Sequence, residues 1–383
     1  MSDLIKKVVL ANGRVRYRFV TDGPRRVNGR RQQITRTFDT KKEARDELAR
    51  IRHQTKTGEF VSPEKITVAE WLDTWLKVAT VDVEKNTVRS YTYAIQPVKD
   101  LFGEKPLQKL TEEDIDEVVA WMVKTGRSGR GVGVYSVELA LSRLRSALNE
   151  AVRRKLVVRN VAQFSRVPRQ LRKEQQKRKA ARKPWTEEEV RSFLRGIRND
   201  RFYAVMLLSL LGLRPAEVCG LKWSAVDLEA GVLRIELTRT LVGTEVEEKE
   251  TKTTAGQRTL PLPTPVIAAL ASFHARQAAE KLAAGGAYED GGYVLVDKWG
   301  RPCTSERLRY HAYRLMREVG VRKVRPYDAR HSALTFLATQ GVPDTVLAAW
   351  AGHTNAAFTK RVYVTVDPQH LRVAATAFDR LLG

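Results

Sequence analysis

Near the N-terminus, apolar and polar residues alternate with a period of two, which is the pattern of half-buried β-strands. Residues 5–20 and 31–38 therefore predict three short strands, the first two joined by a tight turn at Asn12-Gly13. In the second strand one set of alternating positions is apolar, with Val15, Tyr17 and Phe19. The other set is basic, with Arg14, Arg16 and Arg18. The third strand has a similar alternation. One set of positions is basic or polar, with Arg31, Gln33, Thr35 and Thr37, and the other set contains Ile34 and Phe38. We expect one packed face and one basic face.

The basic face has two interpretations. Charge on the exposed side of a sheet is common, so these side chains can simply be solvated. Arginines flanked by glutamine and threonine also suit a β-ribbon that lies in a DNA groove. This second interpretation makes five residues candidate DNA contacts, namely Arg14, Arg16, Arg18, Arg31 and Gln33.

Helical periodicity replaces the alternation after Thr40, which is a good N-cap for a helix over 41–54. In that helix the residues able to cover the apolar face of the sheet are Ala44, Leu48 and Ile51. Four further helices are expected in one all-helical unit, at 67–80, 87–101, 111–124 and 133–155. Its tryptophans recur at helical spacing with leucine and valine, which favours a core position for Trp71, Trp75 and Trp121. The basic last helix adds Arg143 and Arg145 as candidate DNA contacts.

A third unit begins at Thr186, whose spacing to Glu189 is that of a capping box. It is expected to hold an apolar helix at 202–213, strands at 232–240, 245–251 and 257–262 forming one small sheet, and helices near 265–283, 304–319, 328–340 and 343–350. The predicted fold class is mostly α with small β-sheets in a multidomain chain. The expected divisions are 1–62, 63–160, a basic linker over 161–183, and 184–383.

The net charge of the chain indicates which class of molecule it binds. The 383 residues include 68 Lys and Arg against 44 Asp and Glu, a formal net charge of +24. The excess is spread over every segment, which indicates a long basic surface and favours duplex DNA or RNA over an acidic substrate. Binding to heparin-like polymers, to a membrane surface or to ribosomes stays open. Two distant cysteines, Cys219 and Cys303, support neither a disulfide framework nor a zinc site.

The segment between the second and third units is the most basic stretch of the chain. Nine residues from Arg166 to Lys183 are basic and only Glu174 is acidic. Such a run is often a solvated linker, but here it can equally lie along a phosphate backbone. The candidate contacts in this linker are Arg172, Lys173 and Arg178.

Phosphate-loop, dinucleotide, serine-hydrolase and zinc-protease motifs are all missing from the sequence. The third unit instead carries five residue types in a fixed order: Arg214 in GLRPAEV, Lys252 before RTLPLP, Arg330 in an Arg-His pair, His353 in AGHTN, and Tyr363 ten residues later. This ordered set resembles the tyrosine recombinase (phage integrase) family, with 184–383 as its catalytic domain. The helical unit is similar to the family's core-site DNA-binding domain, and the N-terminal sheet to its arm-type domain.

The resemblance implies a site-specific recombinase that integrates and excises a mobile element. Tyr363 would be the nucleophile and form a 3′-phosphotyrosyl link, while Lys252 would protonate the departing 5′-oxygen. Two guanidiniums suit the extra negative charge that develops on an attacked phosphodiester, which fits Arg214 and Arg330. His353 would hydrogen-bond the scissile phosphate. Glu217 is expected to orient Arg214, and Trp350 to be a core aromatic.

One position departs from the family pattern. Where the family usually has histidine or lysine three residues before the second arginine, this chain has Tyr327. A tyrosine can donate a hydrogen bond to a phosphate oxygen but is a poor general base near neutral pH. We therefore keep Tyr327 as a candidate site residue with a phosphate contact as its role.

The expected partners follow from the same resemblance. They are double-stranded DNA with core and arm-type sites, a homotetramer on that DNA, and in some settings an excisionase or directionality factor and a DNA-bending protein. No cofactor, metal or membrane is expected, and the location would be the cytoplasm and nucleoid of a bacterial host. A C-terminal helix within 369–383 would pack on its own domain or on a neighbouring protomer. Two alternatives stay open: a non-catalytic DNA-binding or transcriptional module, and a type IB topoisomerase.

Overall fold

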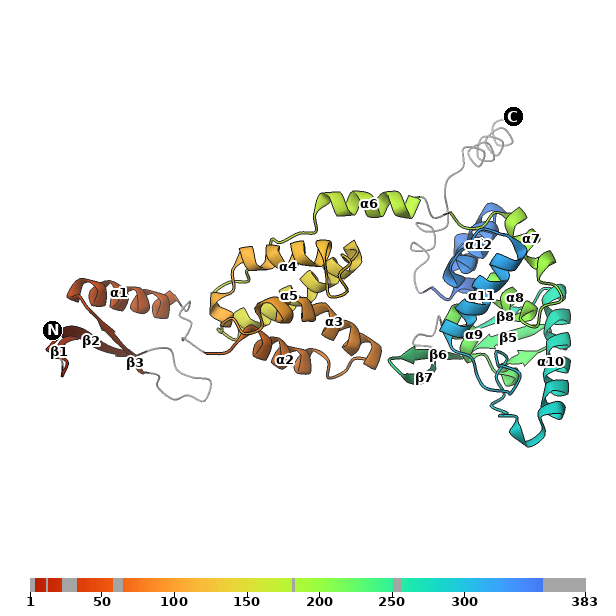
Figure 1. Ribbon diagram of the computed structural model, residues 1–383, viewed down its shortest axis with the longest axis horizontal. Coiled ribbons are helices and arrows are strands. Elements are labelled where there is room, and N and C mark those ends of the chain that lie inside the picture. The colour runs from red at the N-terminus through yellow and green to blue at the C-terminus, as the bar shows by residue number, and fades with distance from the viewer. Residues whose placement is uncertain are drawn as a thin grey trace, which may run out of the picture. The chain divides into compact units, whose positions relative to one another are not determined.

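The computed structural model describes residues 4–11, 13–22, 33–57, 65–180, 183–250 and 256–353. Contacts divide the chain into two compact units, 1–181 and 182–383, each of which is described by itself (Figure 1). Both units are mainly helical with small antiparallel sheets, so the predicted fold class is confirmed. Within the described ranges, no helix combines the length and apolar character needed to cross a lipid bilayer.

The first unit opens with an antiparallel sheet of β1 (Ile5–Val9), β2 (Val15–Asp22) and β3 (Gln33–Phe38), in that order. Helix α1 (Lys41–Thr57) covers one face, and its Ala44, Leu48 and Ile51 are buried with Phe19. Thr40 and Glu43 exchange the reciprocal hydrogen bonds of a capping box, as predicted for the start of this helix.

The register confirms the two faces. Arg18 pairs with Thr37 across the strands, so both lie on the side opposite the buried Phe19. Arg16 lies on the same face and forms a 2.9 Å ion pair with Asp39. Val15 differs from the prediction: it is 38% exposed and pairs with the exposed Val9, because both lie at the hairpin end, outside the cluster formed with α1. Asn12 and Arg31 lie outside the described residues.

A helical core follows, made of α2 (Val68–Ala79), α3 (Lys85–Phe102), the 3₁₀ turn η1 (Leu107–Lys109), α4 (Glu112–Lys124) and α5 (Val134–Arg153). Capping boxes at Thr67 and Thr111 begin α2 and α4. Trp71 is buried and donates to the carbonyl of Ala147 at 3.1 Å, which satisfies its indole while the ring packs in the core. All three tryptophans belong to or pack against this core, as predicted.

The basic segment after α5, expected as a linker, has helical structure that the sequence analysis does not predict. It contains helix α6 (Arg169–Ala180), whose described side chains are exposed except for the half-buried Leu171. An ion pair of 3.1 Å joins Arg172 to Glu138 of α5. The helix forms because arginine, lysine and glutamine have high helix propensity, a signal that the charge count alone did not use.

The second unit begins with α7 (Glu187–Gly196), α8 (Tyr203–Leu210), α9 (Pro215–Gly220) and the turn η2 (Trp223–Ala225). Two small sheets follow: β4 (Val226–Asp227), β5 (Val232–Ile235) and β8 (Arg258–Pro261) form one, and β6 (Leu237–Val242) and β7 (Glu245–Glu250) the other. It ends with α10 (Thr264–Ala284), η3 (Gly285–Ala287), α11 (Ser305–Val319), α12 (Pro326–Thr339) and α13 (Asp344–Ala351).

The strand predicted at 232–240 was wrong as a single element. It divides at the exposed Glu236 into β5, which pairs with β8, and β6, which pairs with β7. The expected single sheet is therefore two sheets. The cause is a tertiary contact. Each half of the segment pairs with a different strand, and this pairing sets the point where the chain passes from one sheet to the other. The alternation of apolar and polar residues continues across that point, so it does not reveal the division.

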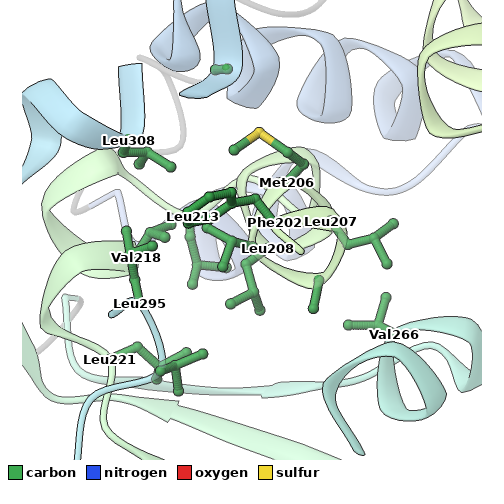
Figure 2. Close-up of a cluster of buried hydrophobic side chains, with 14 of the residues drawn as sticks. Phe202, Met206, Leu207, Leu208, Leu213, Val218, Leu221, Val266, Leu295 and Leu308 are labelled. Atoms are coloured by element: carbon green, nitrogen blue, oxygen red, sulfur yellow. The ribbon is translucent and has the colours of Figure 1, made fainter. Parts of the chain in front are cut away.

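Helix α8 is the centre of the second core. Ala204 to Ser209 are all buried, and Figure 2 shows Met206, Leu207 and Leu208 surrounded by side chains from several other segments, among them Val218, Val266 and Leu308. Gly220 ends α9 against β6, where a Cβ would lie 2.8 Å from the carbonyl oxygen of Leu237. Helices α8 and α9 share this core, while α12 packs against α8 and forms a separate small cluster with the end of α13 through Leu334 and Ala351.

Candidate active site

Arg214 occupies the N-cap of α9, where Pro215 follows as the first helical residue. Its backbone nitrogen donates to Glu217 Oε2 at 2.8 Å, and its guanidinium donates to Glu217 Oε1 at 2.6 Å. A further hydrogen bond of 3.0 Å reaches the carbonyl of Gly352. The side chain of Arg214 stays 30% exposed, so its guanidinium is both fixed and reachable. Glu217 orients Arg214 directly, as expected from their spacing.

Glu217 also holds a second arginine, Arg258, from the start of β8. The two guanidinium nitrogens of Arg258 donate to the two carboxylate oxygens of Glu217 at 3.1 and 3.0 Å. Burial raises the pKa of the Glu217 carboxyl, but the hydrogen bonds and charges of Arg258 and then Arg214 outweigh it and hold the pKa below its ordinary value. Glu217 is therefore a buried carboxylate shared by two cations.

Arg330 is the third arginine, on α12, and it is completely buried. Its guanidinium donates to the carbonyls of Gly212 and Ala351 and to Nε2 of His353, the last at 3.0 Å. Burial at this depth is costly for an arginine unless its donors find acceptors, and here the segment after α8 and the end of α13 supply acceptors for the two terminal guanidinium nitrogens. Arg330 thus joins the segment after α8 to the segment that ends α13.

Three consecutive carbonyls at the end of α13 each accept from one of these arginines. Arg258 Nε binds the carbonyl of Trp350 at 2.7 Å, Arg330 binds that of Ala351, and Arg214 binds that of Gly352 at 3.0 Å. The carbonyl end of a helix carries partial negative charge, so cations are favoured there. Gly352 ends the helix with φ +63°, a conformation that suits glycine. The next residue, His353, lies beside the arginines.

His353 is half-buried beside the arginines. Burial lowers its pKa most, and the charges of Arg330, Arg214 and Arg258 lower it further, to about 4 against an ordinary value of 6.5. Glu217 is the opposing influence and raises the pKa. The ring is therefore neutral at physiological pH.

Sequence reasoning missed Arg258. Arg258 is the first residue of RTLPLP, and the sequence does contain a signal for its role. Strand alternation puts Arg258 on the same parity as Leu260 and Leu262, both of which are buried. An arginine on the inward parity of a strand requires a buried acceptor, and Glu217 is that acceptor.

The structure describes some of the other predicted site residues and leaves the rest outside the described ranges. Tyr327 lies in the first turn of α12, 41% exposed, with its ring edge-on to His331 at 5.6 Å, and it is one helical turn from Arg330. Lys252, Tyr363 and the predicted C-terminal helix lie outside the described residues. Trp350 is half-buried and donates from its indole to the carbonyl of Leu211 at 2.7 Å, consistent with the expected packing role.

The candidate DNA contacts within the described residues differ in exposure, and Arg16, which pairs with Asp39, is half-buried. Arg14, Arg18, Gln33, Arg172, Lys173 and Arg178 are exposed. Arg143 and Arg145 are half-buried: Arg143 lies 4.5 Å from the ring centre of Tyr91, and Arg145 donates to the carbonyls of Ala162 and Ser165. These contacts give Arg143 and Arg145 a structural role that the basic pattern of the helix did not indicate.

The chemistry available at the site is that of anion binding. Guanidiniums from α9, β8 and α12 converge with a neutral imidazole, and one of them remains reachable by solvent. Such a cluster suits a phosphate group, because guanidinium forks match phosphate oxygens. Across the described ranges, no three His, Cys, Asp or Glu side chains gather in an arrangement that could hold a metal ion.

Comparison with known proteins shows which family the sequence matches. Residues 183–370 match the model of the phage integrase family, and residues 67–122 match a phage integrase N-terminal SAM-like domain. An integrase from Streptomyces ambofaciens is 27% identical over 85% of this chain and 82% of its own length. A tyrosine recombinase XerC-like protein from Caldanaerobacter subterraneus subsp. tengcongensis is 25% identical over 97% of both chains. The Tn1549 transposon integrase, solved with a circular intermediate DNA, has a TM-score of 0.67 at 20% identity, covering 82% of this chain and 99% of that one.

Proposed function

The chain belongs to the phage integrase family, and from that premise we propose how its residues act as a site-specific DNA recombinase. The observation that carries the proposal is the convergence of Arg214, Arg330 and His353 from three separate segments. DNA recombination in a mobile element is the function of this family, and the cluster has the charge and geometry to bind one phosphodiester. The two alternatives, a non-catalytic module and a topoisomerase, are not favoured by the family match.

The proposed reaction has two balanced steps. Tyr363 Oη attacks the scissile phosphorus, a P–O bond to tyrosine forms, and the bond to the 5′-oxygen breaks. Lys252 gives a proton to the departing 5′-oxygen, and the tyrosine proton leaves to solvent or a neighbouring base. In the second step a 5′-hydroxyl from another strand attacks the phosphotyrosine: the new P–O bond forms, the bond to Tyr363 Oη breaks, the hydroxyl proton passes to Lys252 or solvent, and the released tyrosine takes up a proton. The phosphodiester is re-formed without ATP, because the covalent link keeps the energy of the original bond.

Arg214 and Arg330 would stabilise the negative charge that develops on the non-bridging oxygens during both steps. Arg214 is the more exposed of the two and is proposed to make the first contact with the phosphate. His353 would hydrogen-bond the same group. Tyr327, exposed one turn away on α12, is proposed to contact a neighbouring phosphate rather than to act as a base.

DNA binding is proposed to be divided along the chain. The basic face of the first sheet would contact arm-type sites through Arg14, Arg16, Arg18, Arg31 and Gln33, and the helical core with α6 would contact the core site. Exposed Arg172, Lys173 and Arg178 would contact phosphates, while Arg143 and Arg145 would act by holding the helical core in shape.

Exchange between two duplexes cuts four strands, so four chains are proposed to assemble on the DNA. Each strand needs its own nucleophile, because Tyr363 stays attached to the strand that it cuts. Coupling through the C-terminal segment, an excisionase or directionality factor, a DNA-bending protein and a location at the host nucleoid are further proposals for the same assembly.

A trapping experiment tests the function with the full chain. Duplexes that the protein selects from a random pool define its core site, and the same duplex is then made with a nick beside the cleavage position. Cleavage releases the short fragment, so the phosphotyrosyl link cannot be reversed. We expect an SDS-resistant adduct with the wild-type chain and none with Tyr363→Phe, which should still bind. Binding without an adduct would contradict the recombinase and indicate a non-catalytic module. Relaxation of a plasmid lacking the site would indicate a topoisomerase.

A further inference from the structure

The buried carboxylate of Glu217 poses an electrostatic problem next to a phosphate site. Glu217 lies within hydrogen-bond distance of Arg214, and its side chain is only 1% exposed, so water does not screen its charge. Left with Arg214 alone, this carboxylate would cancel the positive charge of that guanidinium. It would also repel a phosphate brought to the same place. A second cation at Glu217 removes both effects.

Arg258 has the geometry of that second cation. Its two guanidinium nitrogens face the two oxygens of Glu217, a bidentate fork at 3.1 and 3.0 Å, whereas the guanidinium of Arg214 makes a single bond of 2.6 Å to one oxygen. The side chain of Arg258 is 7% exposed and that of Arg214 is 30% exposed. The buried arginine therefore faces the carboxylate, and the reachable arginine is the one able to meet a ligand.

The contacts of Arg258 also extend to the histidine segment. Its Nε donates to the carbonyl of Trp350 at 2.7 Å, three residues before His353, and its Nη1 donates to the carbonyl of Gly256 at 3.2 Å. One side chain on β8 thus contacts both the carboxylate under Arg214 and the end of α13. Its removal would change the charge at Glu217 and the support of the histidine together.

We propose that Arg258 is a positioning residue for strand cleavage: it neutralises Glu217, so that Arg214 keeps its full positive charge for the scissile phosphate. This role rests on the proposed function, because it concerns the same site. Among the described residues, the hydrogen bonds of this cluster involve the charged side chains of Arg214, Glu217, Arg258 and Arg330, whose formal sum of +2 falls to +1 when Arg258 is lost.

The test compares Arg258→Met with the double variant Arg258→Met plus Glu217→Gln, using the full chain and the nicked core-site duplex. We expect Arg258→Met to slow adduct formation on the order of 100-fold, the size of effect seen when one electrostatic donor is removed from a reaction site. Affinity for the duplex should be unchanged, because other contacts dominate it. Neutralising Glu217 in the same chain should restore about tenfold of the lost rate, since the unbalanced negative charge is then gone.

Arg258→Lys gives a second, independent arm. Lysine keeps the charge but not the fork, so its adduct rate should lie well above that of Arg258→Met and below that of the wild type. Arg234→Met is the matched control: Arg234 lies on the neighbouring strand β5, is half exposed and contacts Glu236 and the carbonyl of Ser224. It should react like the wild type.

Three results would overturn the proposal: a wild-type rate in Arg258→Met, a double variant no faster than the single one, or Arg258→Lys as slow as that expected of the methionine variant. If Arg258→Met does not fold, the lysine variant alone decides. Failure of the proposed function is recognised separately, because the wild-type chain would then form no adduct.

Discussion

Arg330 donates a hydrogen bond to Nε2 of His353 over 3.0 Å, which requires that this ring nitrogen carry no proton. The imidazole is then neutral, with its proton on Nδ1. This agrees with a pKa lowered to about 4 by burial and by the neighbouring arginines. His353 is therefore an acceptor toward Arg330, and its N–H donor is Nδ1.

The protonation of His353 predicts a pH dependence of stability. A histidine in the unfolded chain takes up a proton near pH 6.5, but His353 in the folded chain does so only near pH 4. Between these values the unfolded state binds more protons, so the free energy of unfolding decreases as the pH falls. Histidine NMR should show that the ring whose signal is absent in His353→Gln stays neutral through this interval. Urea unfolding of His353→Gln should depend less on pH over the same interval. A ring at this position that titrates near 6.5 would contradict the prediction.

Arg330→Lys should destabilise the second unit. Lysine cannot reach the carbonyls of Gly212 and Ala351 and His353 Nε2 together, so at least one buried acceptor loses its partner. Each such loss costs about 1 to 3 kcal/mol, and we expect about 2 to 4 kcal/mol in total. Urea unfolding measures the change. Arg309→Lys on α11, whose side chain is 53% exposed, is the matched control and should change stability by less than about 0.5 kcal/mol. Equal effects of the two substitutions would be inconsistent with a supporting role for Arg330.

The basic face of the first sheet predicts a contact with DNA phosphates. Arg18→Ala should weaken binding to a duplex with arm-type sites and lower the slope of log affinity against log salt by about 1. Arg45→Ala on α1 makes the same charge change at another exposed position and serves as the control. Filter binding across a salt series measures both. If the two variants lose affinity equally, net charge alone explains the effect and the face has no specific role.

Helix α6 predicts a second phosphate contact. The double change Lys173→Gln and Arg178→Gln removes two exposed charges, while glutamine keeps the helix propensity. The salt slope for the core-site duplex should fall by about 2 and the slope for arm-type duplexes should not change. Arg276→Gln with Lys281→Gln on α10 is the control pair. A wild-type slope in the α6 variant would show that this helix only connects its neighbours.

Local signals were sufficient for most of the helices. Thr186 and Glu189 show why: a capping box is a short-range hydrogen-bond arrangement, and the predicted one is present at 2.8 and 3.2 Å. Parity in the first sheet was predictable for the same reason, because alternation is a property of a single strand. The missed helix α6 was also local, but the charge of the segment was considered without its helix propensity.

What the sequence could not supply depended on distant partners. Glu236 lies between two strands because β5 pairs with β8 and β6 pairs with β7, and neither partner is visible in the local pattern. Arg258 was overlooked because its acceptor is 41 residues away. The order of Arg214, Arg330 and His353 in the chain indicated a shared site, whereas the carbonyls that hold them were found only in the structure.

The three carbonyls at the end of α13 have a consequence for the entropy of ligand binding. A free arginine side chain carries about 2 kcal/mol of rotamer entropy at room temperature, and a ligand that must order three of them loses much of what it gains. Arg214, Arg258 and Arg330 are already ordered by the carbonyls of Gly352, Trp350 and Ala351. These side chains lose their conformational entropy when the domain folds. The binding of a phosphate at this site therefore does not include that entropy cost.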